Sequence, residues 1–301
     1  MSAFSVGLLG CGPWGRLILR DLVALGADVH VWSISDDSRE AARLGGARSV
    51  RESVRKLPDC EGFVIATATT HHAASIEAVA DRNVPIFVEK PLCADADEAV
   101  RLVALCGEHL FVMDKWRYHN GVLCLAELAR SGVLGQIVGM HTTRIGYADN
   151  HHDVDAAWIL APHDLSIALE VLGGLGSLLA AQGHVDGRGK VRSLAATIGG
   201  DSIPWHTMQL SDRSPIERRE VHVVGTEGTA FLAGGYATEV EIRRGSVLER
   251  RSFEINMPLA DELAVFVRHL RGGPAPRSSA TEGAAIVRLI ASARSVIGAD
   301  G

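Results

Sequence analysis

The feature that most constrains this chain is a glycine-rich turn at residues 10–15, Gly-Cys-Gly-Pro-Trp-Gly. An apolar run over residues 4–9 precedes the turn, apolar residues with helical spacing follow it, and a second apolar run begins at Val29. The spacing G-x-G-x-x-G between a strand and a helix is typical of a dinucleotide-binding β-α-β unit. The sequence therefore predicts a nucleotide-binding fold, with a purely structural glycine turn as the alternative.

Each glycine of this turn has a physical task in such a unit. Gly10 permits the tight turn, Gly12 lets the backbone approach a pyrophosphate, and Gly15 allows helix and strand to pack closely. The helix that follows offers unpaired backbone N–H groups and a partial positive charge to the phosphates. Pro13 and Trp14 lie in the same turn, so we expect both to contact or cover the nucleotide.

The end of the second strand indicates which nicotinamide cofactor is bound. Chains that bind NAD usually place an Asp or Glu there, which accepts hydrogen bonds from the ribose hydroxyls. This chain has Ser33 or Ile34 at that position, with Asp36 and Arg39 beyond it. A serine with a nearby arginine suits a 2′-phosphate, so the sequence favours NADP. NAD is the alternative, because Asp36 could reach back to the ribose.

Strands and helices alternate up to about residue 120, which predicts a parallel sheet. In such sheets ligands bind beyond the carboxyl ends of the strands. The strand expected at residues 84–88 ends in Glu89, Lys90 and Pro91, two charges followed by a chain-breaker. The cofactor-binding candidates at these strand ends are Ala66, Thr67, Thr69, His72, Glu89 and Lys90.

From about Gly121 the pattern changes to short strands joined by turns, which predicts an α+β domain with a largely antiparallel sheet. We expect a nucleotide-binding domain over residues 1–120 and a substrate and oligomerisation domain over residues 121–283. A final helix within residues 284–301 is expected to pack back on the nucleotide-binding domain. The uncovered face of the second sheet is a natural subunit interface, so we expect a homodimer or homotetramer.

Composition narrows the partners and the compartment. The 301 residues carry a formal net charge of −6, which does not indicate binding to nucleic acid or to a membrane surface. The five cysteines are dispersed, and no run is suited to a signal peptide or a membrane span, so we expect a cytoplasmic protein. The runs His71-His72 and His151-His152-Asp153 lack a matching pair of ligands, so no metal is expected.

Several segments resemble the Gfo/Idh/MocA oxidoreductase family in order and spacing, namely GLLGCGPWG, IATATTHHAASIEAV and FVEKPL. Later segments, among them LARSGVLGQIVGM, VVGTEGTAFLAGG and PLADELAVFVRHLRGG, extend the resemblance over essentially the whole chain. The resemblance implies that Lys90 lies beside the nicotinamide and contacts or protonates the substrate oxygen. It also implies a cis peptide bond between Lys90 and Pro91, and pairing of subunits through the open sheet.

The same family carries a D-x-x-x-H element on a helix that opens its second domain, and His163 corresponds to its histidine. Four residues earlier this chain has Ile159 where many relatives have Asp, so it lacks a carboxylate that would orient or relay a proton for the histidine. Asp155 lies two turns earlier only in a continuous helix, and Pro162 argues against that continuity. His163 is the expected proton partner of Lys90, with a capping or core histidine as the alternative.

The candidates for substrate contact are Arg117, Tyr147, Trp158 and Asp164. The resemblance implies an NAD(P)-dependent oxidoreductase that moves a hydride between nicotinamide and a carbinol or ketone carbon of a sugar, nucleotide sugar or cyclitol. One alternative is a reductase of a non-sugar imine or keto substrate. Another is a catalytically inactive, cofactor-binding sensor or regulatory protein, which Ile159 favours.

Overall fold

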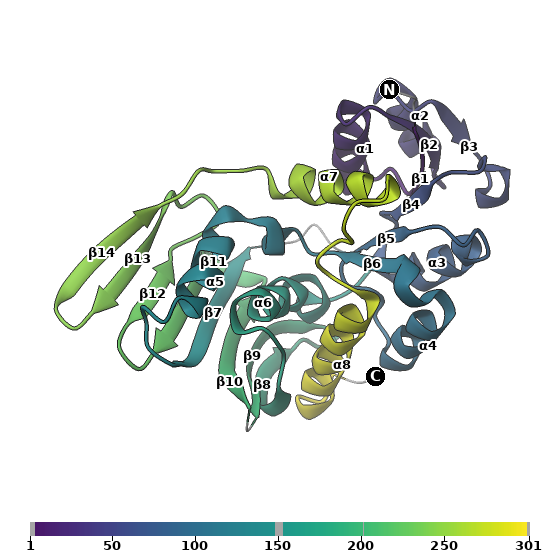
Figure 1. The fold of residues 1–301 in the computed structure, drawn as a ribbon. Coiled ribbons are helices and arrows are strands. Elements are labelled where there is room, and N and C mark those ends of the chain that lie inside the picture. The colour runs from purple at the N-terminus through teal and green to yellow at the C-terminus, as the bar shows by residue number, and fades with distance from the viewer. Residues whose placement is uncertain (1–3, 148–152, 201, 300–301) are drawn as a thin grey trace. The chain divides into compact units, whose positions relative to one another are not determined.

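The computed structural model describes residues 4–147, 153–200 and 202–299. The chain divides into two compact units, each with its own sheet (Figure 1). The first unit contains the residues up to 115 together with residues 259–287. The second contains residues 116–258 and the residues from 288 onward.

The first unit is built on a six-stranded parallel sheet with the strand order β3-β2-β1-β4-β5-β6. Its strands are β1 Phe4–Leu9, β2 Ala27–Trp32, β3 Ser49–Arg51, β4 Gly62–Ile65, β5 Ile86–Glu89 and β6 Leu110–Met113. Its helices are α1 Pro13–Ala24, α2 Asp36–Leu44, α3 His72–Ala80, α4 Ala96–Cys106 and α7 Pro258–Leu270. Because the strands are parallel, their carboxyl ends share one edge of the sheet, which is where ligands bind in such folds.

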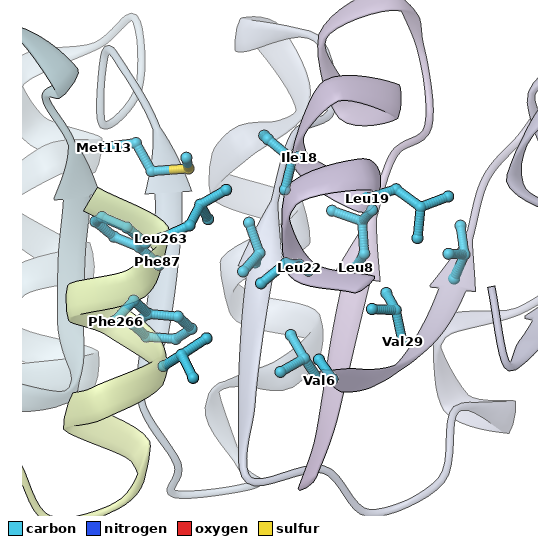
Figure 2. Close-up of a cluster of buried hydrophobic side chains, with 14 of the residues drawn as sticks. Val6, Leu8, Ile18, Leu19, Leu22, Val29, Phe87, Met113, Leu263 and Phe266 are labelled. Atoms are coloured by element: carbon cyan, nitrogen blue, oxygen red, sulfur yellow. The ribbon is translucent and has the colours of Figure 1, made fainter. Parts of the chain in front are cut away.

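Helices α1 and α7 pack into one apolar core on the same face of this sheet (Figure 2). Leu19 and Leu22 come from α1, and Leu263 and Phe266 come from α7. Phe266 stacks on Phe87 of β5, with ring centroids 4.9 Å apart. The helical spacing of the apolar residues in α7 therefore buries that helix against the first sheet.

The second unit is built on an eight-stranded sheet with the order β14-β13-β12-β11-β7-β10-β9-β8. Its strands are β7 Ile137–Tyr147, β8 Ser177–Val185, β9 Val191–Gly200, β10 Ile203–Ser211, β11 Arg213–Gly225, β12 Thr229–Leu232, β13 Glu239–Arg244 and β14 Val247–Ser252. Neighbouring strands are antiparallel except β7 and β10, which are parallel. Helices α5 Asn120–Arg130 and α6 Ala156–Leu172 pack on this sheet, and α8 Ala280–Val296 begins in the first unit and ends in the second.

Helix α6 continues through Pro162, against the expectation that this proline interrupts it. An internal proline costs a helix about 3 kcal/mol. Most residues of α6 are buried, including Trp158, Leu165 and Ile167. Burial of several large apolar side chains stabilises the helix by more than the proline costs, since each contributes about 1.5–3 kcal/mol. Asp155 caps the helix and accepts from the Ala157 N–H at 3.1 Å.

The expected fold class is confirmed, since a parallel α/β sheet is followed by a largely antiparallel one. The two units divide the chain differently from the expected domains. Helix α7 belongs to the first unit and not to a domain spanning residues 121–283, and the final helix, expected to pack on the nucleotide-binding domain, lies in the second unit from residue 288 onward. The sequence patterns also left out β3, α2 and β14, which are short or strongly polar. Among the described helices, none combines the length and the apolar character that crossing a membrane requires.

Candidate cofactor and active site

The glycine turn joins β1 to α1 at the ligand edge of the first sheet. Gly10 has φ +95°, and a Cβ atom there would lie 2.5 Å from the Ala66 carbonyl oxygen. A Cβ atom on Gly15 would collide with the Gly10 carbonyl oxygen. Both positions therefore exclude a side chain, Gly10 through its left-handed backbone as well as its neighbours. Ala66 also ties this turn to β4, because its N–H donates to the Leu9 carbonyl at 2.7 Å.

The start of α1 fits a phosphate-bearing cofactor. A Cβ atom built on Gly12 would meet nothing within 4 Å, so the backbone there faces open space. Gly12 is also the N-cap of α1, no side chain caps that helix, and Pro13 occupies its first turn. The remaining N–H groups of the first turn are those that bind anions at helix N-termini. These residues fit the pyrophosphate of a dinucleotide.

Beyond the end of β2, the side chains of Asp36 and Arg39 lie side by side. Ser33 is buried, and its carbonyl oxygen accepts from Arg39 Nη1 at 3.0 Å. Arg39 Nη2 pairs with Asp36 Oδ1 at 2.5 Å. The Asp36 carboxylate suits ribose hydroxyls, whereas the Arg39 guanidinium suits a 2′-phosphate. The residues behind both cofactor hypotheses therefore lie together at this strand end.

His72 joins two turns on the ligand side of the sheet. It is the first residue of α3 and only 1% exposed. Its Nδ1 atom lies 2.8 Å from the Pro91 carbonyl oxygen, and its Nε2 atom lies 3.2 Å from the Thr67 carbonyl oxygen. Thr69 begins the 3-10 turn that leads into this helix. The imidazole therefore links the segment that carries Thr67 to the segment that carries Lys90 and Pro91.

Glu89 connects the Glu-Lys-Pro segment to the glycine turn. The peptide bond between Lys90 and Pro91 is cis, as the resemblance implies. One carboxylate oxygen of Glu89 accepts from Trp14 Nε1, and the other accepts from the Lys90 backbone N–H at 3.1 Å. Burial raises the pKa of Glu89, while the charge of Lys90 and the Trp14 hydrogen bond oppose that rise. Lys90 itself is partly exposed.

Trp14 also contacts Lys115, which lies shortly after the end of β6. The Lys115 ammonium lies 4.6 Å from the centroid of the indole ring, within the range of a cation–π interaction. Trp14 therefore binds an anion through its N–H group and a cation through its ring face. Both contacts lie within the first unit, at the carboxyl edge of its sheet.

His163 lies on α6 in the second unit and is partly exposed. Trp116 approaches its ring edge-on, with ring centroids 6.5 Å apart and an interplanar angle of 68°. Ile159 lies one turn earlier on the same face of the helix. The imidazole thus has an isoleucine on the preceding turn and an aromatic ring beside it.

Asp164 is turned into the second unit and is 1% exposed. Its Oδ1 atom accepts from Arg144 Nε at 2.8 Å. Burial raises the pKa of Asp164, and Arg144 and a hydrogen bond from Thr142 oppose that rise. The Arg144 guanidinium in turn lies 4.7 Å from the centroid of the Trp116 ring. Asp164, a candidate for substrate contact, thus lies in a buried ion pair next to His163 in sequence.

The other three candidates for substrate contact differ in exposure. Arg117 is buried, and its Nε atom lies 3.2 Å from Glu170 Oε2. Trp158 is buried beneath Arg294, whose guanidinium lies 5.8 Å from the ring centroid. Tyr147 ends β7 and is 72% exposed. Of these three side chains, Tyr147 is the exposed one.

Sequence reasoning missed three buried residues: Trp116 and Arg144, which contact His163 and Asp164, and Glu262 on α7. Arg144 follows inward-facing positions 140 and 142 of β7 by the two-residue period of a strand, so a charge at an inward position was the available signal. Glu262 lies on the apolar face of α7, where a charge interrupts the helical pattern. Trp116 carries no such signal, because an aromatic residue after a strand is common.

Acid–base groups in each unit can support proton transfer, with the Lys90 amine in the first and the His163 imidazole in the second. Over residues 4–147, 153–200 and 202–299, no cluster of three or more His, Cys, Asp or Glu side chains could hold a metal ion. His151 and His152, which were weighed as ligands, lie outside the described residues.

Comparison with known proteins shows which family the segment carrying the first sheet resembles. Residues 4–113 match the model of an oxidoreductase family with an NAD-binding Rossmann fold, GFO_IDH_MocA. The inositol 2-dehydrogenase of Streptomyces avermitilis is 27% identical over 205 residues, which cover 60% of this chain and 60% of that protein. The chain spans between 43% and 60% of the length of the inositol dehydrogenases that it matches.

Solved structures extend the likeness to both units. The UDP-N-acetylglucosamine 3-dehydrogenase of Acidithiobacillus ferrooxidans has a TM-score of 0.85 at 19% identity, covering 99% of this chain and 98% of that one. A levoglucosan dehydrogenase in complex with NADH and levoglucosan has a TM-score of 0.86 at 15% identity, covering 99% of this chain and 98% of that one. At these identities the likeness is one of fold.

Proposed function

We propose that this chain, a member of the Gfo/Idh/MocA oxidoreductase family, is an NAD(P)-dependent enzyme acting on CH–OH groups. It moves a hydride between nicotinamide and a carbinol or ketone carbon of a sugar, nucleotide sugar or cyclitol. The observation that carries the proposal is the ligand edge of the first sheet, where the open backbone at Gly12 and the partly exposed Lys90 are joined through Trp14 and Glu89.

The roles of the residues follow from their chemistry. Bound NAD(P) supplies the acceptor or donor of the hydride. Gly10, Gly12 and Gly15 leave room for its phosphates, and the first turn of α1 binds them. Lys90 donates a proton to the substrate oxygen or polarises it, and His163 exchanges the proton with the surroundings. The first unit, which includes α7, thus binds the nucleotide, and the second unit carries the substrate-binding residues.

The substrate class rests on the names of relatives with this fold. Inositol, UDP-N-acetylglucosamine and levoglucosan are all polyhydroxylated rings. Tyr147 is the substrate-contact candidate with an exposed side chain, so we assign it a direct contact. Arg117, Trp158 and Asp164 are buried, and we assign them the task of holding the substrate-binding surface in shape.

The test is a turnover screen of the purified chain with cyclitols, sugars and nucleotide sugars, after titration with NADH and NADPH followed by nicotinamide fluorescence. Lys90→Ala should abolish the turnover that the screen finds and leave cofactor binding within about twofold. Lys56→Ala removes an exposed lysine of the same unit and serves as the matched control. Failure of both nicotinamide cofactors to bind would contradict the proposal.

A second candidate function is a cofactor-binding sensor without turnover, which the residue Ile159 favours because it removes the carboxylate expected beside His163. The same screen separates the two candidates. A sensor would bind NADH or NADPH with normal affinity, show no turnover with any substrate class, and respond to Lys90→Ala with unchanged binding.

The cofactor, the assembly and the compartment are proposed on separate grounds. We keep NADP ahead of NAD because Arg39 lies at the end of β2. A dimer or tetramer is proposed to form through the outer face of the second sheet, where His141, Thr207 and Gln182 line a groove; light scattering on the purified chain tests it. The five buried cysteines, none in a disulfide, support a cytoplasmic location.

A further inference from the structure

Two histidine side chains lie side by side on the outer face of the second sheet. His141 is on β7 and His222 is on β11, which are neighbouring strands of that sheet (Figure 1). The antiparallel register pairs these two residues directly with each other. Directly opposite residues point to the same face, with Cβ atoms about 4.5–5.5 Å apart. That face is the outer one, because the preceding residues Met140 and Val221 are buried.

The separation of the two imidazole rings allows them to share one metal ion. Their centroids are 6.2 Å apart and their planes differ by 36°. An ion about 2.0–2.1 Å from an imidazole nitrogen is about 3.2 Å from the ring centroid, so two rings that share it have centroids at most about 6.4 Å apart. A tetrahedral ion needs about 5.2 Å, which a rotation that moves one ring by about 1 Å provides. Within the described part of the chain no hydrogen bond holds the His222 ring, whose other ring contact is Phe231, with centroids 5.9 Å apart.

The His141 ring is held in place by two residues of β10. Its Nδ1 atom forms a hydrogen bond with Thr207 Oγ1, and its ring centroid lies 4.6 Å from that of Trp205. Histidines that bind metals usually donate from their second ring nitrogen to a neighbour, which fixes the tautomer and the orientation of the ring. When Nδ1–H donates to Thr207, the lone pair of Nε2 is left for a metal ion.

The surroundings of both rings favour the neutral imidazole, which is the form that binds metals. Burial lowers the pKa of His141 from its ordinary value. Burial, and then the charge of His141, lowers the pKa of His222. Protons therefore compete little with a metal ion for these two nitrogens at neutral pH.

We propose that His141 and His222 form a binding site for Zn²⁺ in which water completes the coordination. Imidazole nitrogens suit Zn²⁺ and Ni²⁺, whereas Mg²⁺ prefers oxygen ligands. The pair is smaller than a cluster of three or more ligating side chains, none of which lies within the described residues. With half the protein ligands of a structural zinc centre, the site should bind Zn²⁺ with a Kd of about 1–100 μM. The proposal does not rest on the oxidoreductase function.

The first measurement is a calorimetric titration of the purified chain with zinc chloride at about pH 7.5. His141→Gln and His222→Gln each leave a single imidazole, and each should weaken zinc binding at least about tenfold. His184→Gln is the matched control, because this exposed histidine of the same sheet lies opposite Ser193 and not opposite another histidine. Unchanged affinity in either variant of the pair would overturn the proposal, as would a wild-type chain that binds no zinc below about 1 mM.

The second measurement locates the ion through Trp205, whose ring contacts His141. Paramagnetic Ni²⁺ quenches tryptophan emission only at short range. Titration with Ni²⁺ should therefore quench a part of the wild-type emission that Trp205→Phe lacks, and excess Zn²⁺ should restore it. Mg²⁺ should have no effect. Equal quenching in the wild type and in Trp205→Phe would place the ion elsewhere on the chain and would overturn the proposal.

The zinc titration is repeated at protein concentrations that differ about a hundredfold, because the outer face of this sheet is also the proposed subunit interface. A site completed by water within one chain should bind one ion per chain with the same affinity throughout. Affinity that rises with protein concentration would mean that a second copy supplies ligands, and would overturn the site as proposed. Neither measurement involves a nicotinamide or a sugar, so failure of the substrate screen leaves the zinc site standing, and the reverse holds too.

Discussion

The two units bury charge in different ways. In the first, Glu262 and Glu89 are buried carboxyl groups, and among the described residues neither forms an ion pair with a buried arginine. In the second, Asp164 is paired with Arg144 at 2.8 Å. A paired charge holds elements together and resists titration, whereas a carboxyl next to a carboxyl titrates when its surroundings change. We therefore expect the buried carboxyl groups of the first unit to depend on their surroundings more than the Arg144–Asp164 pair of the second unit does.

The largest effect is expected where the second unit loses one partner of its buried pair. Arg144→Met leaves Asp164 buried without its cation, which should lower the free energy of unfolding by about 3–5 kcal/mol. Urea unfolding measures it. The matched control is the double variant Arg144→Met with Asp164→Leu, which removes both charges and should recover most of the loss. A loss below about 1 kcal/mol in the single variant would mean that the pair does not stabilise this unit.

A smaller effect on the free energy of unfolding is expected at low pH, from His206 of the second unit. Burial, and then the charge of His141, lowers the pKa of His206 from its ordinary 6.5 to about 3. A lowered folded pKa means that the unfolded chain takes up a proton first, so stability falls as pH falls below 6.5. The loss attributable to this residue should reach about 2 kcal/mol at about pH 5.

Unfolding curves of His206→Gln against pH check this expectation. The glutamine can still accept from or donate to Thr142, which lies 2.9 Å from the His206 Nε2 atom, and it does not titrate. The difference between the wild-type and variant curves should widen toward low pH. A constant difference would mean that the pKa of His206 is the same in the folded and the unfolded protein. This slope is opposite in sign to that of a buried carboxyl such as Glu262 in the first unit, where burial raises the pKa.

A still smaller effect is expected at Trp14, which joins the buried carboxylate of the first unit to the glycine turn. Trp14→Phe removes the donor to Glu89 and should cost about 1–2 kcal/mol of stability. Trp32→Phe is the matched control in the same unit, because its indole donates to the Glu52 backbone carbonyl at a longer 3.3 Å in an exposed setting. Equal losses of thermal stability in the two variants would show that the hydrogen bond from Trp14 to Glu89 contributes no more to stability than the exposed one from Trp32.

The smallest effect is expected at Arg39, at the edge of the first unit. Arg39→Ala should weaken NADPH binding about tenfold, the value of one charge-assisted hydrogen bond, and leave NADH binding unchanged. Arg43→Ala removes another arginine of α2, one paired with Glu40 at 3.0 Å, and serves as the control. Fluorescence titration measures both. Equal weakening of NADH and NADPH would mean that Arg39 does not read a 2′-phosphate.

Local chemistry accounts for what could be predicted of the site. Gly10 has a left-handed backbone, which glycine adopts readily, so this turn could be predicted from a single residue. The proline after Lys90 marks the end of β5 in the same way. The partner of Asp164 and the burial of Glu262 could not be predicted, because each depends on a segment that is distant in the chain; Arg144 lies 20 residues from Asp164. The sequence shows that Asp164 and Glu262 are charged, but it does not show which face of a sheet each side chain packs against.

The sequence by itself determined the β-α-β unit with its open glycine turn, the position of Lys90 after a buried strand, and the change to an antiparallel sheet, since each depends on neighbours in the chain. Only the tertiary structure decided that α7 joins the first sheet, that α6 passes through Pro162, and that Asp164 pairs with Arg144. These outcomes depend on burial against distant segments, whose free energy exceeds local preferences and has no signature in any single stretch of residues.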